Sequence, residues 1–266
     1  MDKSNLIILL LVFALLGTLT CERIKTATGP DNNRLLENYP TTIAPLGEDD
    51  LQNLKQKVNA MFPNLNHANH DTWGVSFIEL RKKNFKGNEQ YTPESALQLA
   101  RDFIFKYKIF FGVQSIADLD SFQYNHITVN DWKINFYQYK SEYLVSNTTI
   151  KINIDSQGIY FFSGKFYTGI ITPAIINYKP NQVEKILIGY KYSYYCWSYH
   201  ELFVEQSLIH DPSRLFIYPD YIRENENIEL RLVWHIPIGS KDDPLFYAYI
   251  DAVTYELVAF GQRFIC

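Results

Sequence analysis

Residues Ile228–Gly239 read IELRLVWHIPIG, and residues Leu245–Phe260 read LFYAYIDAVTYELVAF. In the first stretch the residues alternate with a period of two, which predicts a β-strand with one buried face and one mostly solvent-exposed face. The expected buried residues are Leu230, Leu232, Trp234 and Ile236, and the expected exposed ones are Glu229, Arg231, Val233 and His235. Turn-forming residues from Gly239 to Pro244 precede a second, aromatic strand, and Leu257–Phe260 forms a short third strand. The stretch therefore predicts an antiparallel meander.

Three segments of this region form a recognisable pattern: LFIYP at Leu215–Pro219, LRLVWH at Leu230–His235 and YIDAVTYELV at Tyr249–Val258. The pattern resembles the last part of the propeptide of thermolysin-like metalloproteases, the PepSY-type module. That family usually has glycine at the position of Tyr255. Because glycine suits a positive φ angle, Tyr255 implies a wider turn or local strain.

An earlier part of the chain predicts a helix followed by another meander. Thr92 can cap the helix, Pro93 suits its first position, and Gly112 ends it. Among the strands that follow, two surround Asp155–Gly158, a compact hairpin turn. The segments FG at 111–112, KINFYQ at 133–138, EYLV at 142–145 and KINIDSQG at 151–158 resemble the first propeptide module, the FTP type, of fungalysin and thermolysin-like proteases.

These resemblances cover Tyr91–Phe260, most of the chain. In the second module a helix is expected to begin at Pro180 and to continue through Tyr192–Trp197 toward Gln206. Helix plus meander thus occurs twice, and the expected fold is α+β, with two tandem cystatin-like modules of a helix and an antiparallel meander. The predicted organisation is a signal peptide at 1–21, a flexible tether at 22–47, an FTP-like module at 48–172 and a PepSY-like module at 173–266.

The N-terminus has the features of a targeting segment. Lys3 precedes an apolar run from Leu6 to Leu16, which is too short for a membrane-spanning helix. The cysteine that follows, Cys21, resembles the lipidated residue of a bacterial lipoprotein. This resemblance implies a lipid anchor at Cys21 and a protein of the cell envelope, outside the cytoplasm. Plain secretion is the alternative.

The other cysteines are Cys196 and Cys266. If Cys21 is lipidated, they remain as an even pair in an oxidising compartment and could form a disulfide. Two free thiols are the alternative.

Net charge and the absence of known motifs argue against several classes of function. A net charge of −4 gives no indication of nucleic-acid binding. The sequence has no G-x-S-x-G, P-loop or dinucleotide fingerprint. His200-Glu201 is followed by Val204 where a zinc helix needs its second histidine, and His67 and His70 lie in an asparagine-rich predicted loop. Cys196 and His200 would be close on a helix, but their aromatic neighbours suggest burial. We expect a protein that is not an enzyme and has no catalytic residues, metal site or cofactor.

Three hypotheses about function follow from these patterns. The first is a non-catalytic lipoprotein that resembles a protease propeptide and inhibits or chaperones a separate extracytoplasmic metallopeptidase. The second is a surface lipoprotein that binds peptide or glycan and keeps the fold as a scaffold. The third is an enzyme of unseen type or a truncated protease precursor. A dense aromatic cluster is either a binding surface or core; its residues are Tyr192, Tyr194, Tyr195, Trp197 and Tyr199.

Overall fold

The computed structural model describes residues 39–84, 91–128, 131–173, 176–196, 198–210, 214–240 and 244–262. The fold is mixed α/β, mostly strand with few helices. Its residues fall into two compact units. We call the first the helical unit (Asn32–Ile176 and Arg214–Val233) and the second the hairpin unit (177–210 and 234–262 of the described residues). The predicted cystatin-like modules and their boundaries stay a prediction.

The helical unit contains a six-strand antiparallel array in the order β4-β5-β6-β7-β3-β2. Its strands are β2 (His67–Asp71), β3 (Gly74–Glu79), β4 (Phe122–Thr128), β5 (Asp131–Lys140), β6 (Tyr143–Asp155) and β7 (Gly158–Ser163). In addition, β10 (Arg214–Ile222) runs parallel to β6, and β1 (Thr41–Ile43) pairs with the start of β11 (Asn227–Gly239). The predicted loop around His67 and His70 is wrong, because these residues pair with β3.

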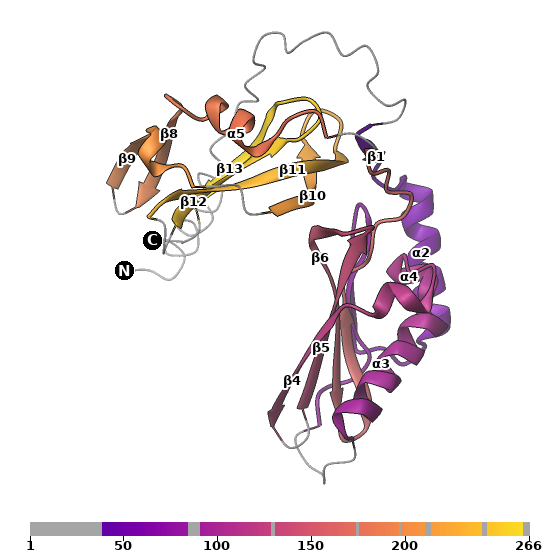
Figure 1. Ribbon diagram of the computed structural model, residues 1–266. Coiled ribbons are helices and arrows are strands. Elements are labelled where there is room, and N and C mark those ends of the chain that lie inside the picture. The colour runs from indigo at the N-terminus through magenta and orange to yellow at the C-terminus, as the bar shows by residue number, and fades with distance from the viewer. Residues whose placement is uncertain are drawn as a thin grey trace, which may run out of the picture. The chain divides into compact units, whose positions relative to one another are not determined.

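Three helices lie together on one side of this array (Figure 1). They are α2 (Glu48–Met61), α3 (Pro93–Lys106) and α4 (Lys108–Phe111); the 3₁₀ helix η1 (Ile116–Leu119) follows. The predicted start of α3 is confirmed, since Thr92 and Ser95 form a reciprocal capping box and Pro93 follows. Gly112 ends α4 with φ of 65°, and a Cβ there would lie 2.1 Å from the carbonyl oxygen of Phe166. Only glycine fits this position.

The helices bury an apolar and aromatic core against the sheet. Phe103 and Phe111 lie 5.1 and 5.2 Å from Phe162, measured between ring centroids. Ile134, Ile152 and similar side chains on alternate positions of β5 and β6 are fully buried. On the opposite face of the same strands the central residues Lys133, Asn135, Lys151 and Asn153 are exposed or half-buried, so the middle of the sheet has one packed face and one open face.

The hairpin unit is built on the second half of β11, with β12 (Pro244–Asp251) between it and β13 (Leu257–Gln262). The predicted meander is confirmed. Beside it lie α5 (Pro180–Val183), the 3₁₀ helices η2 (Glu184–Ile186) and η3 (Gln206–Leu208), and a two-stranded sheet of β8 (Lys191–Cys196) and β9 (Ser198–Phe203). The predicted long helix from Pro180 toward Gln206 is therefore wrong.

The prediction that Arg231 and Val233 lie on an exposed face of β11 is also wrong. Val233 is fully buried and Arg231 is 5% exposed. The Arg231 guanidinium is accommodated because its Nη2 lies 2.6 Å from a carboxylate oxygen of Glu229, and Asp220 of β10 lies 3.9 Å from its Nε. The strand is thus covered on both faces near Arg231, although the alternation of polar and apolar residues predicted one exposed face. Among the described residues, no helix combines the length and apolar character needed to cross a membrane.

Candidate functional site

The predicted aromatic cluster lies on the antiparallel hairpin β8–β9, in which Tyr192 pairs with Leu202 and Tyr194 with His200. Gly189 precedes the hairpin with φ of 83° and ends the short helical segment. Its N–H donates to the carbonyl of Val204, whose own N–H donates to the carbonyl of Tyr190, and so the pairing continues beyond the strands. Tyrosine-rich sequence favours strand over helix where side chains can pack against a sheet, and here they do.

One face of the hairpin belongs to the core. The Tyr192 ring lies 4.6 Å from that of Phe260, and the Tyr194 ring lies 5.1 Å from that of Phe246. Leu202 packs against the same cluster. The residues Tyr192 and Tyr194 of the predicted binding surface are therefore packing residues.

The other face of the hairpin is exposed. Tyr199 and Phe203 are 71% and 59% exposed, among the most exposed large side chains of the described chain. Between them Glu201 forms an ion pair of 2.6 Å with Lys191 across the strands; both are well exposed, so this pair adds little to stability. Tyr195 pairs in register with Tyr199, whereas Trp197 lies outside the described residues. Of the predicted surface residues whose side chains the structure describes, Tyr192 and Tyr194 are partly buried and Tyr199 is exposed.

The predicted proximity of Cys196 and His200 rested on a helix that does not form. In the hairpin Cys196 pairs with Ser198, and His200 pairs with Tyr194. The His200 Nε2 atom lies 2.8 Å from the Ser198 hydroxyl, and its ring stacks on that of Tyr194 at 5.3 Å. Cys21 and Cys266 lie outside the described residues, so the lipid anchor and the disulfide stay predictions.

The described part of the chain contains no group of three or more histidine, cysteine or acidic side chains placed to hold a metal ion. His200 and Glu201 lie on β9, where neighbouring side chains point to opposite faces, and Val204 is fully buried. The helical arrangement that zinc proteases use is not available there.

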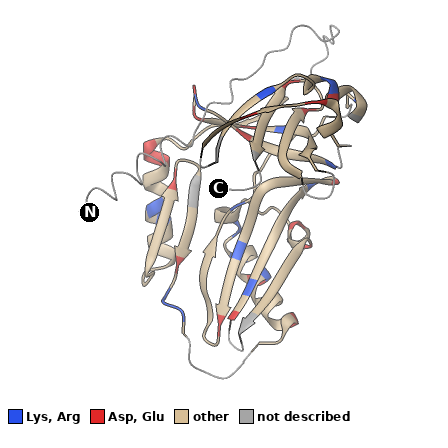
Figure 2. Cartoon of the chain, turned by 90° about the vertical axis from the view of Figure 1, so that its left-hand side faces the viewer, with Lys and Arg blue, Asp and Glu red and all other residues tan. Residues whose placement is uncertain are grey.

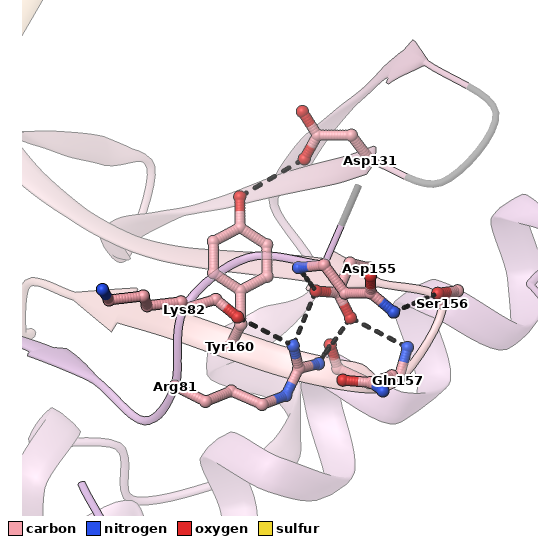
Figure 3. A network of polar contacts seen from close by, with 9 residues as sticks. Arg81, Lys82, Asp131, Asp155, Ser156, Gln157 and Tyr160 are labelled. Carbon is pink, nitrogen blue, oxygen red and sulfur yellow. Dashed lines mark hydrogen bonds and ion pairs between the residues drawn. The ribbon is translucent and has the colours of Figure 1, made fainter. Parts of the chain in front are cut away.

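Two turns carry buried aspartates. In the first, which we call the Asp155 turn (residues 155–158), Gly158 has φ of 104°. The Asp155 carboxylate forms an ion pair with Arg81, in which Nη1 donates at 2.7 Å and Nη2 contacts the other oxygen (Figure 3). It also accepts hydrogen bonds from the backbone N–H groups of Asn84 and Gln157, at 2.7 and 2.8 Å. Burial opposes ionisation of Asp155, but these donors outweigh it and lower the pKa of the carboxyl.

A second acid lies beside this turn. Asp131 is 3% exposed and forms an ion pair of 2.7 Å with Lys83. The Tyr160 hydroxyl donates to the Asp131 carboxylate at 3.4 Å (Figure 3). Burial and the nearby Asp131 raise the pKa of Tyr160 to about 12. Arg81 and Lys83 were not predicted from sequence, although their basic run directly follows β3. Because the acids of this network are paired with cations, we interpret it as structural.

The second turn, the Asp251 turn (residues 251–256), joins β12 to β13. The Asp251 carboxylate accepts backbone N–H bonds of 2.8 and 2.9 Å from Val253 and Thr254. Of the two alternatives expected at Tyr255, a wider turn or local strain, the structure shows the second, since its φ is 66°. The Tyr255 hydroxyl donates to the Gln182 carbonyl at 2.6 Å, and its ring stacks on Tyr178 at 4.6 Å, so side-chain contacts offset the backbone cost.

Comparison with known proteins adds little. No family model matches the chain, and no curated protein matches it. Among solved structures, the chain is similar to the Bacillus megaterium YpeB C-terminal domain, with a TM-score of 0.34 and 13% sequence identity over 83% of this chain and 99% of that one. At this TM-score the likeness assigns neither a fold family nor a function.

Proposed function

We propose that the chain is a non-catalytic protein of the protease-propeptide type, with an FTP-like and a PepSY-like module, which binds a separate extracytoplasmic metallopeptidase and inhibits it or assists its folding. The resemblance of Tyr91–Phe260 to such propeptides supports this proposal. The positive φ at Tyr255 is consistent with it, because the family places glycine at that position.

The observation that carries the proposal is the exposed aromatic face of β9. Tyr199 and Phe203 present large apolar surfaces to solvent from one side of a two-stranded sheet. Exposed aromatic side chains are typical anchors of protein interfaces, and a strand edge can pair with an extended segment of a partner. The hairpin β8–β9 offers both features at one place.

The same proposal covers catalysis and location. We propose that the chain is not an enzyme, since the spacing of Cys196 and His200 does not place them as helical neighbours. We also propose that Cys21 carries the lipid and that residues 22–47 form the tether that separates the anchor from the units.

The test is a titration of residues 22–266, produced in soluble form, into a thermolysin-like protease from the same host. Saturable inhibition of peptide hydrolysis, without cleavage of the added protein, is expected. The double variant Tyr199→Ser/Phe203→Ser should weaken inhibition at least about tenfold, because interface aromatics contribute upwards of roughly 1 kcal/mol each. Tyr139→Ser is the matched control, since Tyr139 is 50% exposed on β5 of the helical unit.

Unchanged protease activity at saturating protein would rule out inhibition, and recovery of denatured protease in the presence of the chain would then distinguish folding assistance. Equal inhibition by the double variant and the wild type would exclude the hairpin as the docking surface. The alternative, peptide or glycan binding by the predicted aromatic cluster, is weakened because Tyr192 and Tyr194 pack inward.

A further inference from the structure

The open face of the sheet in the helical unit carries an ordered set of polar side chains. Across β4, β5 and β6, Asn125 pairs with Lys133 and Lys133 with Asn153, while Gln123 pairs with Asn135 and Asn135 with Lys151. These residues alternate with the buried Ile134 and Ile152, so they lie on the face opposite the helices. We call this set the amide–lysine face: Gln123, Asn125, Lys133, Asn135, Lys151 and Asn153.

Two cations lie at the centre of this face. Lys133 and Lys151 are exposed and occupy diagonal positions on neighbouring strands, about 7 Å apart at the backbone. Figure 2 views the sheet of the helical unit from the side opposite its helices and shows basic bands in the middle of the strands, with acidic bands nearer the strand ends. The amide–lysine face itself contains no acidic residue.

The nearest acids on the same face are already neutralised. Asp131 lies two residues before Lys133 and pairs with Lys83. Asp155 lies two residues after Asn153 and pairs with Arg81 (Figure 3). Glu79 lies two strands beyond β6, about 10 Å away, and accepts a hydrogen bond of 2.7 Å from Asn66. The charges of Lys133 and Lys151 therefore remain available to an anionic ligand.

Aromatic rings continue the face on the next strands. Phe161 pairs with Asn153 across β6 and β7, and the Phe161 ring stacks on Phe77 at 5.9 Å with an interplanar angle of 24°. Both rings are half-exposed. On the other side, the Tyr137 hydroxyl donates to Gln123 at 2.9 Å and so orients that amide. One continuous surface thus offers cations, amides and ring faces.

This chemistry fits one class of ligand. Amide groups both donate and accept, as sugar hydroxyls do, lysines attract carboxylates, and aromatic rings can contact the C–H groups of a sugar ring. A protein partner is a poorer fit, because the cores of protein interfaces are depleted in lysine, and two lysines lie at the centre of this face. We propose that the amide–lysine face binds an acidic oligosaccharide that carries carboxylate groups, a function separate from the hairpin.

The test measures binding of a galacturonate hexasaccharide to the full chain in mild detergent by calorimetry. Lys133→Gln and Lys151→Gln should each weaken binding about fivefold, the upper range for an exposed charge pair, and binding should weaken further as salt rises. The single variants Lys57→Gln and Lys106→Gln are the matched controls, since each removes one positive charge from an exposed position, on α2 and α3 respectively. They should bind as the wild type does.

Urea unfolding of each variant checks that the fold is retained. A variant whose urea midpoint is lower than that of the wild type is replaced by the corresponding Lys→Arg variant, which keeps the charge and should bind the hexasaccharide. A neutral maltohexaose should bind at least about tenfold more weakly, because it lacks the carboxylates. Absence of hexasaccharide binding, or equal losses in the lysine variants and the controls, would overturn the proposal. Equally tight binding of a glutamate hexapeptide would replace the glycan with an acidic peptide.

Discussion

The Asp155 turn and the Asp251 turn meet the same backbone requirement by different means. Each contains a buried aspartate and a residue with positive φ, but that residue is Gly158 in the first turn and Tyr255 in the second. Glycine adopts positive φ at little cost, whereas a tyrosine there is strained. The Asp155 turn is held by an ion pair with Arg81, 74 residues away, and the Asp251 turn by a tyrosine contact with Gln182, 73 residues away.

The comparison shows that similar turns can be stabilised by charge or by aromatic contact, and that in both cases the stabilising group comes from a distant segment. The Asp155 turn should therefore be the more sensitive to loss of its acid and to pH. The Asp251 turn should be sensitive to removal of the Tyr255 hydroxyl. Because a tyrosine hydroxyl does not ionise in acid, this contact should not depend on pH under acid conditions.

The largest expected effect is that of Asp155→Ala. This change removes the carboxylate that accepts from Arg81 and from two backbone N–H groups in a mostly buried site, while Arg81 keeps its bonds to the carbonyls of Lys82 and Gly158. It should lower the free energy of unfolding by about 3 kcal/mol. The shift in the urea midpoint measures it. Ser156→Ala, which removes a hydroxyl that lies 3.5 Å from the Asn84 amide in the same turn, is the control and should cost less, about 1 kcal/mol. Similar losses in the two variants would show that the ion pair does not hold the turn.

A smaller effect is expected for Tyr255→Phe, which removes the hydroxyl donor to Gln182 and keeps the ring. The free energy of unfolding should fall by about 1 kcal/mol. Tyr255→Gly relieves the backbone strain but removes both contacts, so it should be no more stable than the wild type. A glycine variant with a higher urea midpoint than the wild type would contradict the view that the side-chain contacts offset the strain.

The finest distinction between the turns is their dependence on pH. Because the pKa of Asp155 is lowered in the folded chain, its stabilising contribution is fully present above the ordinary aspartate pKa of about 3.9 and is lost as pH falls through the folded value. The wild type should lose stability below about pH 4 more steeply than Asp155→Asn. Urea midpoints measured at successive pH values give the difference, and Tyr255→Phe should run parallel to the wild type. Parallel profiles for Asp155→Asn and the wild type would contradict the assigned pKa shift.

Local patterns predicted a substantial part of the fold. The Thr92-Pro93 start and the Gly112 end of the helical segment, the Asp155–Gly158 hairpin and the terminal meander are confirmed, because each depends on residues close together in sequence. The unusual Tyr255 was also located correctly, since a positive φ is a property of one residue.

The errors occurred where tertiary contacts decide the outcome. The helix expected through Tyr192–Trp197 is replaced by a strand, in which Tyr192 and Tyr194 share one face and pack on Phe260 and Phe246. Arg231 looked exposed, but Glu229 and Asp220 make its burial tolerable. The network of Arg81 and Lys83 with Asp155 and Asp131 joins segments about 50 to 75 residues apart, and periodicity carries no information at that range.

The sequence by itself determined the start at Thr92-Pro93 and the end at Gly112 of one helical segment, and the turns at Asp155–Gly158 and after Asp251, because capping, glycine conformation and period-two alternation are local properties. The tertiary structure alone decided which tyrosines are core and which are surface, which charges are neutralised, and which polar side chains form one face across β4, β5 and β6. These features depend on strand register and on packing between distant residues, which bring together groups that no local pattern relates.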